Sequence, residues 1–296
     1  MNPPRLFDPV LTRLRLARAW QGNPPMFLLQ RVVEDMLERL AAVKRAFQRV
    51  VDLGTPAPLL VESLARERPD CLVTHLAPVS GALGQMGGII ADAQMLPLAS
   101  GSVDLIVSAL ALHSIDDLPG ALAQIRRALR PDGLFMACLP GGQTLHELRH
   151  AMAAAEAEIT GGASPRVAPF ADLRDLGGLL QRAGLALPVT DVDSLIVRYA
   201  SMFDLMRDLR AMGATSNLVQ RSRIPLRRRV LVRAAEIYAE QFADADGRVR
   251  ATFELVWLSG WAPHESQQKP LKPGSAKMRL ADALGTTEIK ASEIDP

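Results

Sequence analysis

The sequence predicts an α/β fold with a doubly wound, mainly parallel sheet. Short apolar runs bounded by glycine and proline recur along the first half of the chain. Such runs are typical of parallel strands that are covered on both faces. Segments with apolar residues at helical spacing lie between them. Strands that alternate with helices in this way form parallel sheets with right-handed crossovers.

The N-terminal residues 1–47 are predicted to form a helical segment. A basic helix is expected over residues 6–20 and should be broken by the glycine and prolines at 22–25. Residues 27–47 carry leucine, valine and methionine at helical spacing, so this second helix should pack on the sheet.

Five strands are predicted at residues 50–53, 71–76, 89–91, 103–110 and 134–139, with helices at 59–67, 120–130 and 144–159. Asp117 should cap the second of these helices, and Thr144 with Glu147 should form a capping box for the third. The residues 130–133 are predicted to form a turn because they contain proline and glycine. The glycine-rich residues 80–88 do not match the spacing of a phosphate-binding loop, so we expect a loose crossover there.

The second half of the chain is predicted to place a helical insertion, at about residues 200–243, before the last strand. A loop at 161–170, a helix at 172–182 and a strand at 189–197 should precede it. Helices at 201–212 and 226–242 should form it, and a strand at 249–257 should follow. The sheet domain is therefore expected to span residues 48–262. Proline, glycine, lysine and serine are frequent in residues 263–296, which predicts a flexible tail.

The composition is that of a folded globular chain. The 296 residues are 48% hydrophobic and 22% charged, with a formal net charge of +2. That charge is too small to indicate nucleic acid, and no apolar run approaches the roughly 20 residues of a membrane span. Cys71 and Cys138 fall in predicted buried strands, so we expect a reducing compartment and no metal site.

The functional expectations centre on residues 49–58, where a buried strand runs into a turn that opens a helix. Ligands of open α/β sheets bind beyond the carboxyl end of such a strand. Nucleotide-binding turns place several glycines here, whereas this turn has Gly54 followed by Pro56 and Pro58. Proline fixes φ near −65° and removes a backbone N–H, so part of a ligand's backbone contact should be lost.

These motifs resemble those of the class I S-adenosylmethionine-dependent methyltransferases. The general motifs are VVDLG (50–54), ADA (91–93), LPL (96–98), SVDLIVS (102–108) and LRPDG (129–133). Narrower runs are LALH (110–113) with DDLPGAL (116–122), the loop 161–170 and SGWAP (259–263). Through them the chain is similar to the branch of the mitochondrial complex I assembly factor reported as a protein-arginine hydroxylase, with its alphaproteobacterial relatives. The malonyl-carrier-protein methyltransferase of biotin synthesis is a more distant resemblance.

The resemblance implies a Rossmann-like methyltransferase domain that holds S-adenosylmethionine. Cofactor-binding positions would be Asp52, Gly54, Thr55, Asp92, Ala93, Ser108 and Leu110. In the family, the first motif cradles the methionine end of the cofactor, and the acid at Asp92 reads the adenine amino group. Gln143 and Arg166 would face the substrate. His113 is the candidate catalytic residue, but a single histidine at a strand end more often has a structural role, so both roles remain open.

One further departure bears on cofactor affinity. The acid that would hold the ribose hydroxyls at the end of the second strand is replaced by Ala77. A missing charge-assisted hydrogen bond forfeits roughly 1.5–3 kcal/mol, or about one to two decades of affinity. Cofactor binding is therefore expected to be weakened or lost.

The leading expectation is an S-adenosylmethionine-dependent, methyltransferase-like protein that acts on a protein substrate. The resemblance links it to respiratory complex I assembly, with a respiratory-complex subunit as partner. It would lie in the cytoplasm of a bacterium, or in the mitochondrial matrix of a eukaryote. One alternative is an assembly factor that has lost its cofactor and does not catalyse. Another is an RNA methyltransferase, whose RNA-binding surface would be the basic cluster Arg221, Arg223, Arg227, Arg228, Arg229 and Arg233. A solvated helix face is the favoured interpretation of that cluster.

Overall fold

The computed structural model describes residues 5–268, 278 and 280–286. The chain forms two compact units, Met1–Pro263 and His264–Pro296, each of which is described by itself. The second unit contains the short helix α9 (Leu280–Leu284). The predicted flexible tail at 263–296 falls mostly on residues outside the described ranges.

The described part of the first unit is built on a seven-stranded sheet of order β3-β2-β1-β4-β5-β7-β6. The strands are β1 (Arg49–Leu53), β2 (Leu72–Ala77), β3 (Ile89–Ile90), β4 (Val103–Ala109), β5 (Leu129–Pro140), β6 (Ala186–Tyr199) and β7 (Val249–Trp261). The first five are parallel, and β7 runs antiparallel to both β5 and β6. The predicted doubly wound α/β fold is confirmed.

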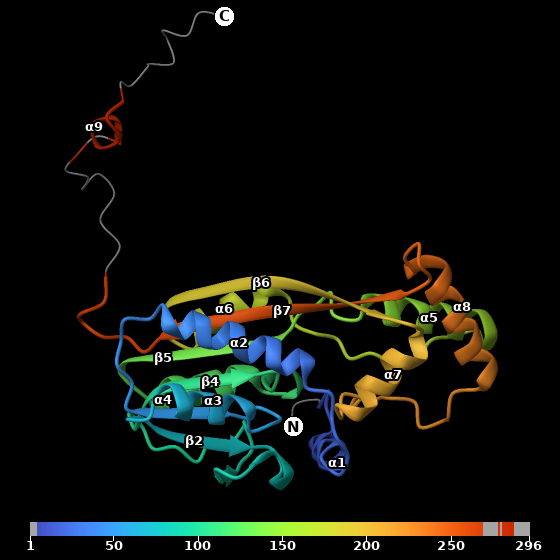
Figure 1. Cartoon of the computed structure of the whole chain (residues 1–296), viewed down its shortest axis with the longest axis horizontal. Coiled ribbons are helices and arrows are strands. Elements are labelled where there is room, and N and C mark those ends of the chain that lie inside the picture. Colours follow the sequence, from blue (N-terminus) through green and yellow to red (C-terminus); the bar gives the residue numbers. More distant parts are fainter. Residues whose placement is uncertain (1–4, 269–277, 279, 287–296) are drawn as a thin grey trace, which may run out of the picture. The chain divides into compact units, whose positions relative to one another are not determined.

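Helices cover both faces of this sheet because alternate strand residues point to opposite sides. On one face, β4 residues Leu105 and Val107 belong to the same core as α2 (Phe27–Ala41) and α3 (Leu59–Glu67). On the other face, Ile106 packs in a core with α4 (Leu118–Ala128) and α6 (Leu173–Arg182). Figure 1 shows α2 lying across the first of these faces.

The helical insertion lies between β6 and β7, as predicted. It consists of α7 (Met202–Ala211) and α8 (Arg228–Phe242), and α8 packs against α5 (His146–Thr160). Figure 1 places α5, α7 and α8 beyond the ends toward which the β2 and β4 arrows point. The N-terminal helix α1 (Pro9–Ala19) lies on the same side. Among the described residues, no helix combines the length and apolarity that crossing a bilayer requires.

The predicted capping box at the start of α5 is wrong. The helix begins at His146 after Leu145, which has a left-handed φ of 54°. The Thr144 hydroxyl instead donates to the backbone oxygen of Glu254, at 3.0 Å. The Glu147 carboxylate accepts from the Thr252 hydroxyl. Glu147 therefore joins α5 to β7, and Thr144 joins the residues just before α5 to the same strand. Local sequence spacing does not reveal these contacts.

Several element boundaries also differ from the predictions. Helix α2 ends at Ala41, and α4 ends at Ala128, where Leu129 is already extended. The predicted turn at 130–133 is an irregularity inside β5, marked by a φ of 65° at Asp132 and a shift in the register between β4 and β5. Cys138 is buried in β5, but Cys71 precedes β2 and is only partly buried.

Candidate cofactor and substrate site

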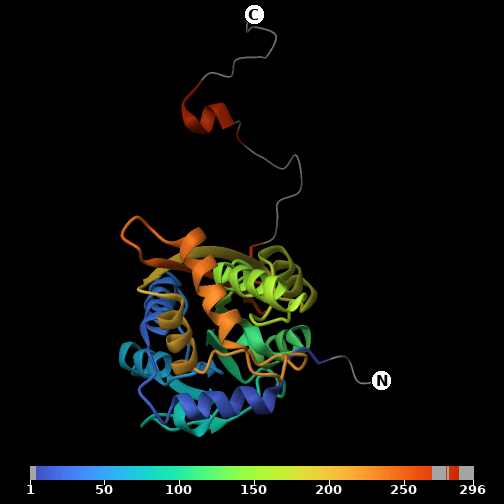
Figure 2. The same cartoon turned by 90° about the vertical axis from the view of Figure 1, so that its right-hand side faces the viewer.

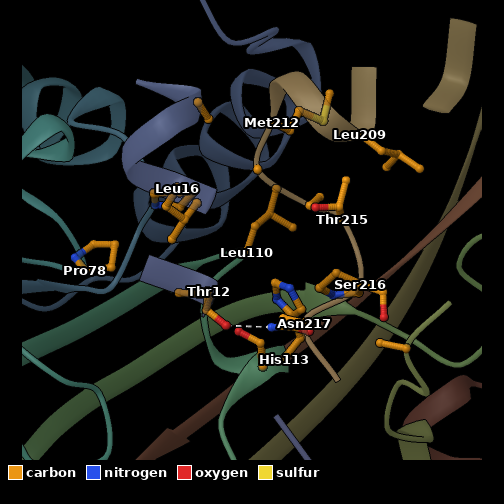
Figure 3. Close-up of a pocket in the computed structure, with 18 of the residues that line it drawn as sticks. Thr12, Leu16, Pro78, Leu110, His113, Leu209, Met212, Thr215, Ser216 and Asn217 are labelled. Atoms are coloured by element: carbon orange, nitrogen blue, oxygen red, sulfur yellow. Dashed lines mark hydrogen bonds between the residues drawn. The ribbon is translucent and has the colours of Figure 1, made fainter. Parts of the chain in front are cut away.

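A cavity of about 440 Å³ lies beyond the carboxyl ends of β1 and β4. Its walls come from α1, the turn after β1, the segment after β4, the loop 166–170 and the connection between α7 and α8. Figure 3 shows part of this lining, including Leu110, His113 and residues 215–217. A cavity of this size at this position matches the usual location and volume of a small-molecule site in an open α/β sheet.

The turn after β1 keeps its shape despite its prolines. Gly54 has a φ of +74°, and its N–H donates to the Leu76 oxygen at 2.8 Å. A Cβ at Gly54 would lie 3.1 Å from the Ala111 Cβ, so the backbone approaches the β4 side closely. Pro58 has a φ of −75° and caps α3 in a helical conformation. The prolines therefore remove two N–H groups without disturbing the strand-turn-helix path.

The cavity brings six of the predicted site residues together. They are Gly54, Asp92, Ala93, Leu110, His113 and Arg166. Asp52, Thr55 and Ser108 do not line it and are fully buried behind its floor. Gln143 does not line it either, and its backbone N–H faces the Glu254 carboxylate at 3.4 Å. The binding roles of all these residues remain predictions.

The buried residues behind the floor form a hydrogen-bonded layer. The Thr55 hydroxyl donates to Asp52 and accepts from the Ala109 N–H at 3.1 Å. The Ser108 hydroxyl donates to the Leu53 oxygen at 2.7 Å. His75 Nε2 lies 3.1 Å from the Thr55 oxygen and 3.7 Å from Asp52 Oδ2. Burial raises the pKa of Asp52 to about 8 and lowers the pKa of His75, so at neutral pH this layer ties β1, β2 and β4 together mainly through uncharged groups.

Asp92 lies at the cavity but already has a partner from the N-terminal helix. Its Oδ2 is 2.8 Å from Arg13 Nη2, and its Oδ1 accepts from the Gln94 N–H at 2.9 Å. The side chains of Asp92 and Arg13 are 31% and 52% exposed, so solvent screens this pair. An adenine amino group could therefore reach Asp92 at the cost of a weak ion pair.

Helix α1 is a wall of the site that the sequence analysis did not identify. The Trp20 indole N–H donates to the Pro56 oxygen at 2.8 Å, and the Asn217 side chain donates to the Thr12 hydroxyl at 2.8 Å. In Figure 2, α1 (dark blue) lies across the end of the molecule that faces the viewer. Leu16 and Trp20 pack against the small buried cluster of Ala77, Val79 and Ala82, so the position where the family has its ribose-binding acid belongs to an apolar cluster. The sequence predicted a basic helix over residues 6–20 but did not indicate that this helix lines the cavity.

His113 and Arg166 also line the cavity. His113 follows β4, and its ring centroid lies 6.0 Å from that of Phe170. Burial lowers the pKa of His113 to about 4, so the imidazole is neutral at physiological pH. Arg166 is held by the buried Glu156 and lines both this cavity and a second one of about 530 Å³ beside the loop 163–170.

These features fit an S-adenosylmethionine molecule in part of the cavity. Gly54 leaves room for close approach, Asp92 offers an acceptor, and Leu110 with Ala111 provides an apolar surface. Two kinds of contact expected from the family are missing. Ala77 has no carboxylate for the ribose hydroxyls, and the nitrogens of Pro56 and Pro58 carry no hydrogen to donate. The described residues contain no group of three or more histidine, cysteine or acidic side chains placed to hold a metal ion. The fold and the site together define a class I methyltransferase-like protein.

Comparison with known proteins identifies the family. The model of the methyltransferase domain matches residues 51–137. The chain is 38% identical to Arginine-hydroxylase NDUFAF5, mitochondrial, of Danio rerio, over 90% of this chain and 85% of that protein. It is 35% identical to the Homo sapiens protein of the same name, over 94% and 83%. The chain therefore belongs to the methyltransferase-fold family of the NDUFAF5 arginine-hydroxylases, which confirms the predicted resemblance.

More distant relatives share the same domain. A Malonyl-[acyl-carrier protein] O-methyltransferase from Laribacter hongkongensis is 35% identical over 83% of this chain and 87% of its own length. Among solved structures, a Bacillus halodurans protein described as a methyltransferase has a TM-score of 0.53 at 14% identity, over 78% of this chain and 98% of that one. The [4+2]-cyclase SpnF has a TM-score of 0.51 at 14% identity, over 88% and 98%. At such identities the structures show the fold alone.

Proposed function

We propose that this protein binds S-adenosylmethionine in the 440 Å³ cavity and acts on an arginine side chain of a substrate protein during assembly of respiratory complex I. The observation that carries the proposal is the 38% identity to an arginine-hydroxylase over 90% of the chain. That alignment is long enough to include both the cofactor end and the insertion end of the cavity. A complex I subunit is the proposed partner, met in the cytoplasm of a bacterial cell.

The residues at the carboxyl ends of the strands would hold the cofactor. Gly54 would admit its methionine end close to the backbone, and Asp92 would accept a hydrogen bond from its adenine amino group. Leu110 would exclude water from the sulfonium. When bound, S-adenosylmethionine supplies an electrophilic methyl group. The protein would then contribute positioning and desolvation of the acceptor.

The reaction on arginine can be identified by the mass of the product. Methyl transfer adds one CH₂ unit, whereas hydroxylation adds one oxygen atom and needs an oxidant besides the cofactor. The test incubates the protein and S-adenosylmethionine, with and without dioxygen and a reductant, with the peripheral complex I subunits of its own source. We expect one arginine to gain one of these two masses. Unmodified subunits, with the cofactor shown to be bound, would contradict the proposed activity.

A second candidate function is that of an assembly factor without catalysis. Pro56 and Pro58 remove backbone donors from the cofactor turn, and Arg13 already pairs with Asp92. These features favour a protein that keeps the fold as a binding scaffold. Under this alternative the protein would bind the same subunit without changing its mass.

A further inference from the structure

Two polar side-chain atoms of residues at the cavity wall have no hydrogen-bond partner in the part of the chain that the structure describes. Among the described residues, six buried side-chain nitrogen or oxygen atoms make no hydrogen bond. Two of these atoms, His113 Nδ1 and Ser216 Oγ, belong to residues that line the cavity. Leaving such an atom unpaired costs about 1–3 kcal/mol, and native proteins seldom retain one without a reason. Figure 3 labels both residues among the lining side chains.

The backbone around Ser216 is held in place from the N-terminal segment. The Arg15 guanidinium donates to the backbone oxygens of Thr215 and Ser216. The neighbouring Asn217 is fixed through its side chain by Thr12 and through its backbone oxygen by the Asp8 N–H, at 2.9 Å. The Ser216 hydroxyl is therefore presented by a well-anchored segment, and its lack of a partner does not reflect a loosely placed loop.

The environment of His113 suits an acceptor of hydrogen bonds. Because burial keeps the imidazole neutral, one ring nitrogen retains a lone pair at physiological pH. Phe170 lies beside the ring and also lines the cavity. A guanidinium group carries five N–H donors, is only weakly hydrated, and stacks on aromatic faces. It could donate to the imidazole and to the serine hydroxyl while it lies against Phe170.

We propose that His113 and Ser216 bind the guanidinium group of the substrate arginine. Ser216 belongs to the connection between α7 and α8, so the helical insertion would contribute directly to recognition of the acceptor. The strand ends would hold the cofactor at one end of the cavity, and the insertion would hold the acceptor at the other. This inference rests on the proposed function for the identity of the acceptor, but its test needs neither cofactor nor turnover.

The probe is N-acetyl-L-arginine amide, added to the full-length protein whose histidine side chains carry ¹⁵N. We expect the imidazole resonance that is absent from His113→Asn to shift as the probe is added. N-acetyl-L-norleucine amide, which lacks the guanidinium, should leave this resonance in place. An arginine probe that moves no resonance of His113, or a norleucine probe that moves it equally, would overturn the proposal.

The contribution of Ser216 is measured with Ser216→Ala. Loss of one hydrogen bond to a charged group should weaken probe binding roughly tenfold or more. Its Tm should equal or exceed that of the wild type, because the change removes an unpaired buried hydroxyl. Ser114→Ala is the matched control, since Ser114 lines the same cavity and its hydroxyl is not among the unpaired buried atoms of the described residues. An equal loss of probe affinity in both variants would refute the role of Ser216.

The outcomes separate this inference from the proposed function. If subunits are modified normally by Ser216→Ala and His113→Asn, the proposed function stands and the guanidinium site is wrong. Suppose that the probe shifts the His113 resonance and binds less tightly to Ser216→Ala, while no complex I subunit is modified. The guanidinium site then stands and the proposed catalysis is wrong. His113→Asn also keeps the test decisive if Ser216→Ala fails to fold.

Discussion

Asp52 lies near the end of β1 with no exposure to solvent, although the family resemblance predicts it as a cofactor-binding residue. Burial raises the pKa of its carboxyl group to about 8, against the opposing effect of the hydrogen bond from Thr55. Asp52 therefore carries a proton at neutral pH and supports the turn from behind. It does not offer a negative charge to a ligand.

This protonation predicts a particular dependence of stability on pH. An acid whose pKa is raised on folding binds more protons in the folded chain than in the unfolded one. The stability from this group is therefore lost as pH rises from near 4, the unfolded value, to near 8. Burial lowers the pKa of His75 and His113, so their contribution is lost only as pH falls below about 6.5. The effect of Asp52 is isolated between these limits, at about pH 6.5–8.

Urea unfolding at several pH values in that window would measure the effect. The wild type should lose up to about 1.4 kcal/mol of unfolding free energy per pH unit relative to Asp52→Asn. The variant keeps an acceptor for the Thr55 hydroxyl and cannot titrate. Parallel pH profiles for the two proteins would show that Asp52 is ionised in the folded state.

Single residues of the site could be predicted only where a motif marks them. Gly54 and Asp92 follow strands in recognisable runs, and the structure places both at the cavity. Arg13 and Ser216 carry no such mark, because their positions depend on contacts between segments about 80 and 200 residues apart along the chain. No local pattern encodes a contact of that kind.

At the scale of elements, the turn between β1 and α3 determines whether a ligand can approach the sheet. Its sharpness depends on the positive φ of Gly54, since Pro56 and Pro58 can only take negative φ. The turn is therefore more dependent on one glycine than a turn with three would be. The bounds of α3 were predicted correctly because the prolines fix where that helix can begin.

Gly54→Ala tests this dependence. A left-handed conformation costs an alanine about 1–2 kcal/mol, and its Cβ would also crowd Ala111 at 3.1 Å. Chemical denaturation should therefore show a lower free energy of unfolding by at least about 1 kcal/mol. Gly178→Ala in α6 is the control, because a Cβ there meets no atom within 4 Å. It should raise stability by roughly 0.5–1 kcal/mol. A neutral Gly54→Ala would contradict the strained turn.

Other elements have bounds or packing positions that the sequence pattern did not predict. The edge strand β6 extends beyond both predicted ends, and its neighbour β7 extends beyond its predicted C-terminal end, since their pairing with each other continues past the apolar core of each run. Helix α1 was predicted as a basic helix. None of its residues is buried, so the sequence has no buried apolar face that would indicate where the helix packs. Its contacts include a hydrogen bond from Asn217 to Thr12 and, just after the helix, one from Trp20 to the Pro56 oxygen.

At the scale of the whole molecule, charge pairing argues against the RNA alternative. Arg233 is paired with Glu158, Glu236 and Glu240, and Arg221 lies 3.6 Å from Asp8. Part of the basic cluster of the helical insertion is therefore neutralised within the protein. The cavity of about 440 Å³, lined by segments distant in the sequence, fits a small cofactor and one side chain better than a polynucleotide.

Calorimetric titration measures whether the carboxyl ends of the strands hold S-adenosylmethionine. We predict micromolar binding to the wild type and a loss of roughly tenfold or more in Asp92→Asn. Arg13→Gln, which breaks the same ion pair but keeps the carboxylate, should bind as tightly as the wild type or more tightly. A folded protein that gives no binding heat at millimolar S-adenosylmethionine would show that this cavity does not hold the cofactor.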